Sequence, residues 1–245
     1  MSNRILEKLD EYLGKNDYDA ALKYLLYWHD EFEKTGNNAN LLMIKNELMG
    51  LYRKLGKKDE AMNAVSGALS LIGQMGIEDN VGAATTYLNS GTVYKAFSQA
   101  EKALPLFNKA LEIYESSLPA GDKRFGGLYN NMALALIDCG KFPEAYSFYQ
   151  KAIDTMSNIE DGGLEVAITY LNIANAKETE KGALDAEGEI TELLEKAMAL
   201  LDSHKKRDGY YAFVCDKCAS VFGYFGYFLY EKELESRARS IYEGA

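Results

Sequence analysis

A repeated pattern of residues constrains the fold of this chain more than any other feature. The segment TTYLNSGTVY at 85–94 has a close counterpart in TYLNIANA at 169–176 and a looser one in YNNMALAL at 129–136. In each segment an asparagine lies two residues after a tyrosine and two before a small residue, at steps of 42 and then 41 residues. Regular self-similarity of this kind is typical of stacked-repeat proteins, so the sequence predicts an array of similar units.

The repeat frame extends over the whole chain. The small or apolar position recurs in six places, namely Leu9, Met49, Gly91, Ala133, Ala174 and Ala219. Seven residues later stand Asn16, Gly56, Ser98, Gly140, Lys181 (with Gly182 beside it) and Gly226. Gly and Asn accept the left-handed conformation that ends many helices, so these positions predict turns. Each unit therefore reads as a helix, a tight turn and a second helix.

The composition agrees with an all-helical fold. The chain of 245 residues has only three prolines, and 47% of its residues are apolar. Proline is excluded from helix interiors, so its scarcity favours long helices. We expect one all-α domain, an α-solenoid of about six hairpins. The predicted units span approximately 1–36, 37–77, 78–119, 120–159, 160–204 and 205–245.

The offsets resemble those of the tetratricopeptide repeat, whose signature includes an aromatic residue, Leu-Gly/Ala, Tyr and Ala. Tyr87, Tyr129 and Tyr170 occupy the first aromatic position. The spacing exceeds the usual length of about 34 residues. The segment EKALPLFNKALEIYESSLPAGDKRFGGLYNNMALAL is most similar to the long repeats of the kinesin light chain type, a resemblance that does not imply a motor. It implies a right-handed superhelix with its first helices along a concave groove.

The resemblance also implies which residues border the groove. Candidate peptide-binding residues are Asn46, Arg53, Lys54, Asn89, Thr92, Lys95, Asn130, Asn131, Asn172 and Asn175, with Glu178 and Lys217 as further groove-side positions. A row of amides supplies both donors and acceptors for the backbone of an extended peptide, and the three basic residues can meet an acidic group. Alternatively, the amides bond a neighbouring helix or face solvent, and the basic side chains are simply solvated.

Few residues suit catalysis or metal binding. The pair Cys215 and Cys218 in CDKC falls on core positions of the last unit and inside a helix, which favours buried packing over a redox or zinc role. The chain has only two histidines, His29 and His204, and no phosphate-binding loop. We expect no enzyme activity, no cofactor and no metal.

Charge and hydropathy restrict the partners. The formal net charge is −10, and the short HKKR at 204–207 is the largest basic cluster, which argues against nucleic acid. The most apolar stretch, residues 210–230, is interrupted by Asp216 and Lys217. We therefore expect no membrane span and a soluble, cytoplasmic protein.

A protein- or peptide-binding scaffold is the expected function. One alternative is a peptide-sensing regulatory protein. The other is a structural homo-oligomer, such as a homodimer formed through the aromatic residues of 210–230.

Overall fold

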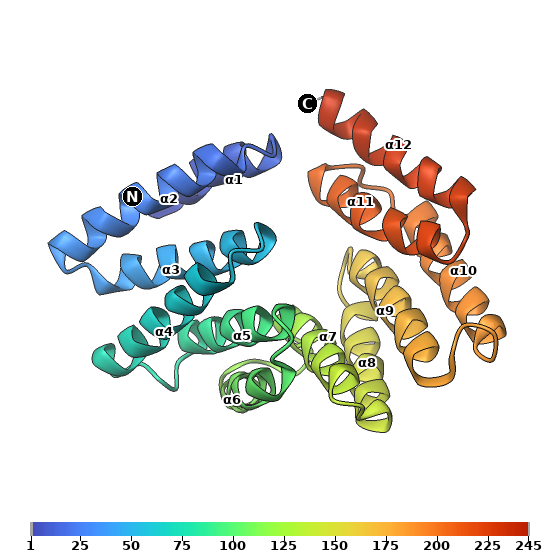
Figure 1. The fold of residues 1–245 in the computed structure, drawn as a ribbon, viewed down its shortest axis with the longest axis horizontal. Helices are drawn as coiled ribbons and strands as arrows, with labels where there is room; N and C mark the ends of the chain where they lie inside the picture. Colours follow the sequence, from blue (N-terminus) through green and yellow to red (C-terminus); the bar gives the residue numbers. More distant parts are fainter. Residues whose placement is uncertain (1, 245) are drawn as a thin grey trace. The chain divides into compact units, whose positions relative to one another are not determined.

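The computed structural model describes residues 2–244, which form twelve α-helices and no strand (Figure 1). The helices are α1 (Ser2–Gly14), α2 (Tyr18–Thr35), α3 (Asn38–Lys54), α4 (Lys58–Met75), α5 (Val81–Ala96), α6 (Ala100–Ser117), α7 (Lys123–Asp138), α8 (Phe142–Ser157), α9 (Gly163–Lys181), α10 (Glu187–Ser203), α11 (Gly209–Tyr224) and α12 (Phe228–Gly244). The all-α class is confirmed.

Successive helices form hairpins joined by turns at the positions that the repeat frame predicts. A left-handed backbone occurs at Asn16, Gly56, Ser98, Gly140, Gly182 and Gly226, with φ between 54° and 85°. In the fifth hairpin Gly182 takes this conformation, while Lys181 is the last residue of α9. Residues 182–186 separate α9 from α10, whereas residues 55–57 are enough between α3 and α4, so the turn of the fifth hairpin is longer.

The helix starts are fixed locally by short polar side chains. The carboxylate of Asp17 accepts a hydrogen bond from the backbone N–H of Ala20 at the start of α2. Asn37, Asn80, Asp122 and Asp208 act in the same way at the starts of α3, α5, α7 and α11. These bonds satisfy backbone donors that have no partner within the helix, so each hairpin begins at a defined residue.

The chain divides after Pro119 into two compact units of three hairpins each, and the two are described separately. In the first unit, α5 approaches α6 closely because Gly91 carries no side chain. A Cβ at Gly91 would lie 2.4 Å from the ring of Phe107, which is fully buried. The small residue and the large one are therefore complementary in shape.

The second unit has a continuous apolar core from α9 to α12. It includes Leu171, Ala174, Leu194, Tyr211 and Phe222, all of them buried. The first helices of successive hairpins also pack against each other, α7 on α9 and α9 on α11 in this unit, and α3 on α5 in the first. This packing brings equivalent positions of neighbouring repeats together. Among residues 2–244, no helix combines the length and the apolar character that a membrane span requires.

Candidate functional site

Two of the three recurring asparagines, Asn89 and Asn172, are each hydrogen-bonded to an asparagine on the first helix of the preceding repeat. In the first unit, the side-chain N–H of Asn89 on α5 donates to the side-chain oxygen of Asn46 on α3 over 2.8 Å. The side-chain nitrogen of Asn46 in turn donates to the hydroxyl of Thr86 (3.0 Å) and to the backbone carbonyl of Leu42 (2.9 Å). Asn46 therefore links its own helix to two points on α5.

The second unit repeats this arrangement. The side-chain N–H of Asn172 on α9 donates to the side-chain oxygen of Asn130 on α7 over 3.1 Å. All four paired asparagines are half-buried. In both pairs the donor belongs to the later repeat and the acceptor to the earlier one. Part of the reason that the amides recur is thus structural, because each pair ties one repeat to the next.

Each pair leaves hydrogen-bonding capacity unused. A side-chain amide offers two N–H donors and one carbonyl acceptor. Within residues 2–244, Asn89 and Asn172 each use one N–H, and their side-chain oxygens have no partner. Asn130 uses its oxygen and neither of its N–H groups. We call these two sets the amide pairs, Asn46–Asn89 and Asn130–Asn172.

Other predicted groove residues bond within their own helices. Asn131 donates to the carbonyl of Gly127 (2.8 Å), and the hydroxyl of Thr92 donates to the carbonyl of Leu88 (2.9 Å). Asn175 on α9 is half-buried. Asn131 therefore differs from Asn172, although both occupy the same position of the repeat.

The predicted basic residues lie in the last turns of α3 and α5. Arg53 and Lys54 end α3, and Lys95 is in the last turn of α5, where positive charge is favoured by the helix dipole. Partial burial lowers the pKa of the Arg53 guanidinium. The Lys54 ammonium lies 4.5 Å from the ring centroid of Tyr18, a contact that links it to the start of α2.

Several polar residues that lie near the amide pairs were not singled out from the sequence. Thr86 and Ser90 on α5 are fully buried, and the hydroxyl of Ser90 lies 3.7 Å from the sulfur of Met49 on α3. Burial and the nearby Asp10 raise the pKa of Glu47 on α3. The polar residues on both sides of Tyr87 in TTYLNS were the available signal, because an ordinary buried helix face contains few hydroxyls.

Glu178, which the sequence predicts on the groove side, contacts the last hairpin. The hydroxyl of Tyr224 on α11 donates to Glu178 on α9 over 3.1 Å, and that of Tyr210 donates to Glu165 near the start of α9. Lys217 on α11 is exposed. Hydrogen bonds between tyrosine and carboxylate side chains therefore join α11 to α9, whereas a hydrogen bond between two asparagine amides joins α9 to α7.

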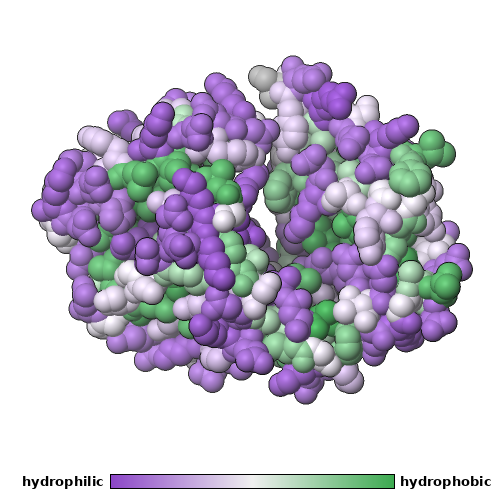
Figure 2. Space-filling view, in the orientation of Figure 1, coloured by the Kyte–Doolittle hydropathy of each residue, from purple (hydrophilic) through white to green (hydrophobic). Residues whose placement is uncertain are grey.

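The aromatic residues of 210–230 divide between core and surface. Tyr211 and Phe222 are fully buried, whereas Phe228 and Leu229 at the start of α12 are 61% and 84% exposed. The face of the molecule seen in Figure 2 is mostly hydrophilic, with separate apolar patches. We define the exposed residues Tyr224, Phe228, Leu229 and Tyr230, which lie around the turn between α11 and α12, as the terminal aromatic surface.

The two cysteines of CDKC are buried, as the repeat frame predicts. Burial raises the pKa of the Cys215 thiol to about 11 and that of Cys218 to about 12, so neither is a thiolate near neutral pH. In the part of the chain that the structure describes, no group of three His, Cys, Asp or Glu side chains is placed to hold a metal ion.

Comparison with known proteins finds repeats similar to those of this chain. A family model described as tetratricopeptide repeat matches residues 84–117 and 127–155. Kinesin light chain-related protein 3 from Arabidopsis thaliana is 28% identical over 203 residues, which cover 79% of this chain and 30% of the relative. This chain spans 29 to 30% of the length of the curated relatives that it matches.

Two solved structures show the same fold. BtubC (BKLC) from P. vanneervenii has a TM-score of 0.62 and 18% identity, covering 93% of this chain and 91% of that chain. A Rap protein complexed with competence and sporulation factor has a TM-score of 0.59 and 14% identity, covering 99% of this chain and 78% of that chain. At these identities the likeness concerns the α-solenoid fold alone.

Proposed function

We propose that this chain, which is built of tetratricopeptide repeats of the kinesin light chain type, is a protein-interaction module that binds an extended peptide along its first helices. The observation that carries the proposal is the unused hydrogen-bonding capacity of the amide pairs. Asn89 and Asn172 are held in place by a neighbouring repeat, and each keeps a side-chain oxygen for a ligand.

The chemistry of an amide pair suits a peptide backbone. An extended backbone presents N–H and C=O groups in alternation, so it needs acceptors and donors side by side. A side chain that is already fixed by a hydrogen bond loses less conformational entropy when it binds a ligand. Each unit carries its own pair, and each pair therefore forms a separate short contact with peptide backbone.

The basic residues of the first helices extend this surface. Arg53, Lys54 and Lys95 stand at the ends of α3 and α5, the two helices that hold the first amide pair. Such charges contribute to the rate of association and to the choice of partner more than to affinity. The Rap protein named above was solved with competence and sporulation factor, which supports the use of this fold for ligand binding.

A peptide selection tests the proposal. A phage-displayed library of random linear peptides is selected against the purified chain, and the affinity of the best peptide is measured by calorimetry. The double substitution Asn89→Ala with Asn172→Ala is expected to weaken binding by about tenfold or more, since each lost hydrogen bond is worth about 0.5–1.5 kcal/mol. Asn131→Ala is the matched control, because this asparagine bonds only its own helix among the described residues.

Two results oppose the proposal. One is a peptide that binds with the same affinity to the double variant and to the unmodified chain. The other is a selection that yields no peptide at all while thermal melting shows a folded protein. Melting curves of each variant separate loss of binding from loss of folding.

A second candidate function is self-association through the terminal aromatic surface. Phe228 and Leu229 are exposed at the start of α12. Exposed apolar patches on soluble proteins often mark interaction sites. This candidate and the peptide-binding function use different surfaces, so they can be tested independently.

A further inference from the structure

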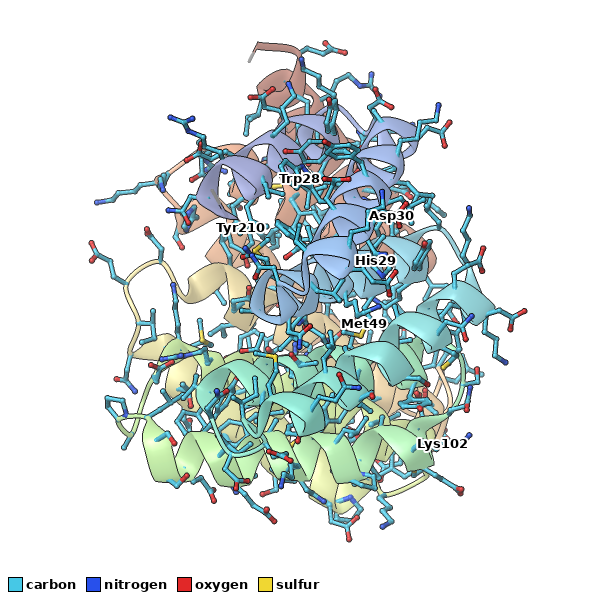
Figure 3. The ribbon with its side chains drawn as sticks, turned by 90° about the vertical axis from the view of Figure 1, so that its left-hand side faces the viewer. Trp28, His29, Asp30, Met49, Lys102 and Tyr210 are labelled. Carbon is cyan, nitrogen blue, oxygen red and sulfur yellow. The ribbon has the colours of Figure 1, made fainter. Side chains whose placement is uncertain are left out.

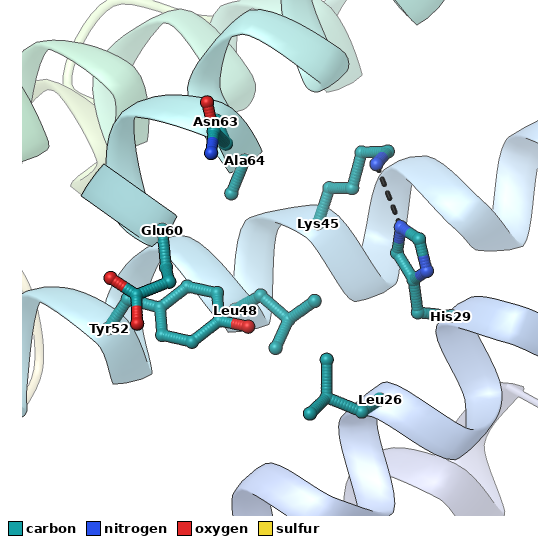
Figure 4. Close-up of a pocket in the computed structure, with 8 residues that line it drawn as sticks. All are labelled: Leu26, His29, Lys45, Leu48, Tyr52, Glu60, Asn63 and Ala64. Atoms are coloured by element: carbon teal, nitrogen blue, oxygen red, sulfur yellow. Dashed lines mark hydrogen bonds between the residues drawn. The ribbon is translucent and has the colours of Figure 1, made fainter. Parts of the chain in front are cut away.

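The first unit contains a pocket between α2, α3 and α4 (Figure 4). Its volume is about 230 Å³. The apolar lining is Leu26, Leu48, Tyr52 and Ala64, and the polar lining is His29, Lys45, Glu60 and Asn63. A pocket of this size with apolar walls has room for a short aliphatic chain.

Lys45 stands at one side of this pocket in an unusual setting for a lysine. The residue is half-buried, and within residues 2–244 its ammonium forms no ion pair with a carboxylate; it contacts the imidazole Nε2 of His29 over 2.9 Å. The absence of a side chain at Gly67 makes room for it, since a Cβ there would lie 3.0 Å from the Lys45 Nζ. Burial lowers the pKa of Lys45, which increases the fraction of neutral amine.

His29 is placed to take a proton from this amine. Nε2 must be unprotonated to accept a hydrogen bond from the lysine, so Nδ1 carries the proton of the neutral ring. Nδ1 lies 3.3 Å from the Asp30 carboxylate, which favours that tautomer. Figure 3 shows His29 and Asp30 at consecutive positions of α2. A nucleophile, a base within hydrogen-bond reach and a group that orients the base are the elements of an activated nucleophile.

We propose that Lys45 is a reactive lysine that accepts a short, uncharged acyl group from an acyl thioester. The neutral Nζ attacks the thioester carbonyl, a C–N bond forms, the C–S bond breaks and the sulfur leaves as a thiolate. The proton released from nitrogen passes to His29 and then to solvent. The acyl chain lies against Leu26 and Leu48 in the pocket.

The product suits the site better than the free lysine does. Acylation removes a charge that partial burial destabilises, and the amide N–H that remains can still donate to His29 Nε2. The surrounding acidic groups select the donor. Asp30 and Glu60 face this region and Glu33 acts on Lys45 through its charge, so an anionic donor such as an acyl phosphate is repelled and a neutral thioester is not.

The test uses the whole chain and the acetyl thioester of N-acetylcysteamine as the probe. Initial acetylation rates are measured at each lysine by digestion and mass spectrometry. Lys45 is expected to react about tenfold faster than Lys23, an exposed lysine on α2, a factor within reach of general-base catalysis. His29→Gln is expected to bring the two rates close together, and His204→Gln is the matched control that leaves their ratio unchanged.

A second variant keeps the test decisive if His29→Gln disturbs folding. Gly67→Ala presses on the end of the Lys45 side chain, and we expect it to lower the ratio of the two rates several-fold. Equal rates at Lys45 and Lys23 in the unmodified chain, or a ratio that does not change in either pocket variant, overturn the proposal.

Discussion

The side-chain amide of Asn89 lies 2.8 Å from the side-chain oxygen of Asn46, a residue of the preceding repeat. The same relationship joins Asn172 to Asn130 in the second unit over 3.1 Å. These bonds fix the register between the first helices of neighbouring repeats. They also hold the remaining amide donors and acceptors in defined positions, and the proposed function depends on those positions.

The amide pair of the first unit should contribute measurably to stability. Asn89→Ala is expected to lower the free energy of unfolding by about 1 kcal/mol, and a cycle with Asn46→Ala should show coupling of similar size. Chemical denaturation measures both. Asn131→Ala, which loses only a bond within its own helix, should cost less. Additive effects of the two substitutions would contradict the interaction.

Gly91 should tolerate no side chain. Gly91→Ala places a Cβ 2.4 Å from the ring of Phe107, so we expect a loss of about 1–3 kcal/mol from overpacking. Gly50 in α3 is the matched control because nothing lies within 4 Å of a Cβ built there. Gly50→Ala should raise stability by up to about 1 kcal/mol through helix propensity. Thermal melting of the two variants should therefore shift in opposite directions.

Asp122 should give the second unit a pH-dependent stability. Hydrogen bonds from the Arg124 side chain and backbone lower the pKa of Asp122 from 3.8 to about 2. Since the pKa is lower in the folded state, the stabilisation is present above about pH 4 and is lost as pH falls through about 2. The stability difference between the unmodified chain and Asp122→Asn, measured by urea denaturation, should shrink over this range. A difference that stays constant would argue against this assignment.

The terminal aromatic surface predicts concentration-dependent association. If it binds a second copy, sedimentation should show a dimer that Phe228→Glu together with Leu229→Glu dissolves, because two charges cannot be buried without partners. Both residues are exposed in the single chain, so the substitution should leave the melting temperature nearly unchanged. A monomer at all concentrations would exclude this function.

The repeated hairpins were predictable from sequence because their signals are local. Gly56, Gly140 and Gly226 predict turns because glycine readily adopts a left-handed backbone, and the structure places left-handed backbone at all three. The buried Cys215 and Cys218 follow from the same frame. A position that needs a small side chain or a left-handed backbone in every repeat has a similar residue type in every repeat, so the sequence alone reveals it.

The partner of each asparagine could not be predicted in this way. Asn131 and Asn172 hold the same repeat position, yet one bonds its own helix and the other bonds Asn130. The difference depends on the facing residue of another helix, which the position within one repeat does not specify. The contact between His29 and Lys45 likewise depends on the register of two helices, so no sequence motif predicts it.

Side-chain amide resonances give the most direct test of the central claim, which is that the amide pairs contact a bound peptide. The chain is labelled with ¹⁵N and titrated with a peptide from the selection described above. The account predicts that the side-chain NH₂ signals of Asn89 and Asn46, or of Asn172 and Asn130, shift with the same dissociation constant that calorimetry gives. Signals that shift only near Phe228 and Leu229, with all four asparagines unmoved at saturation, would contradict it.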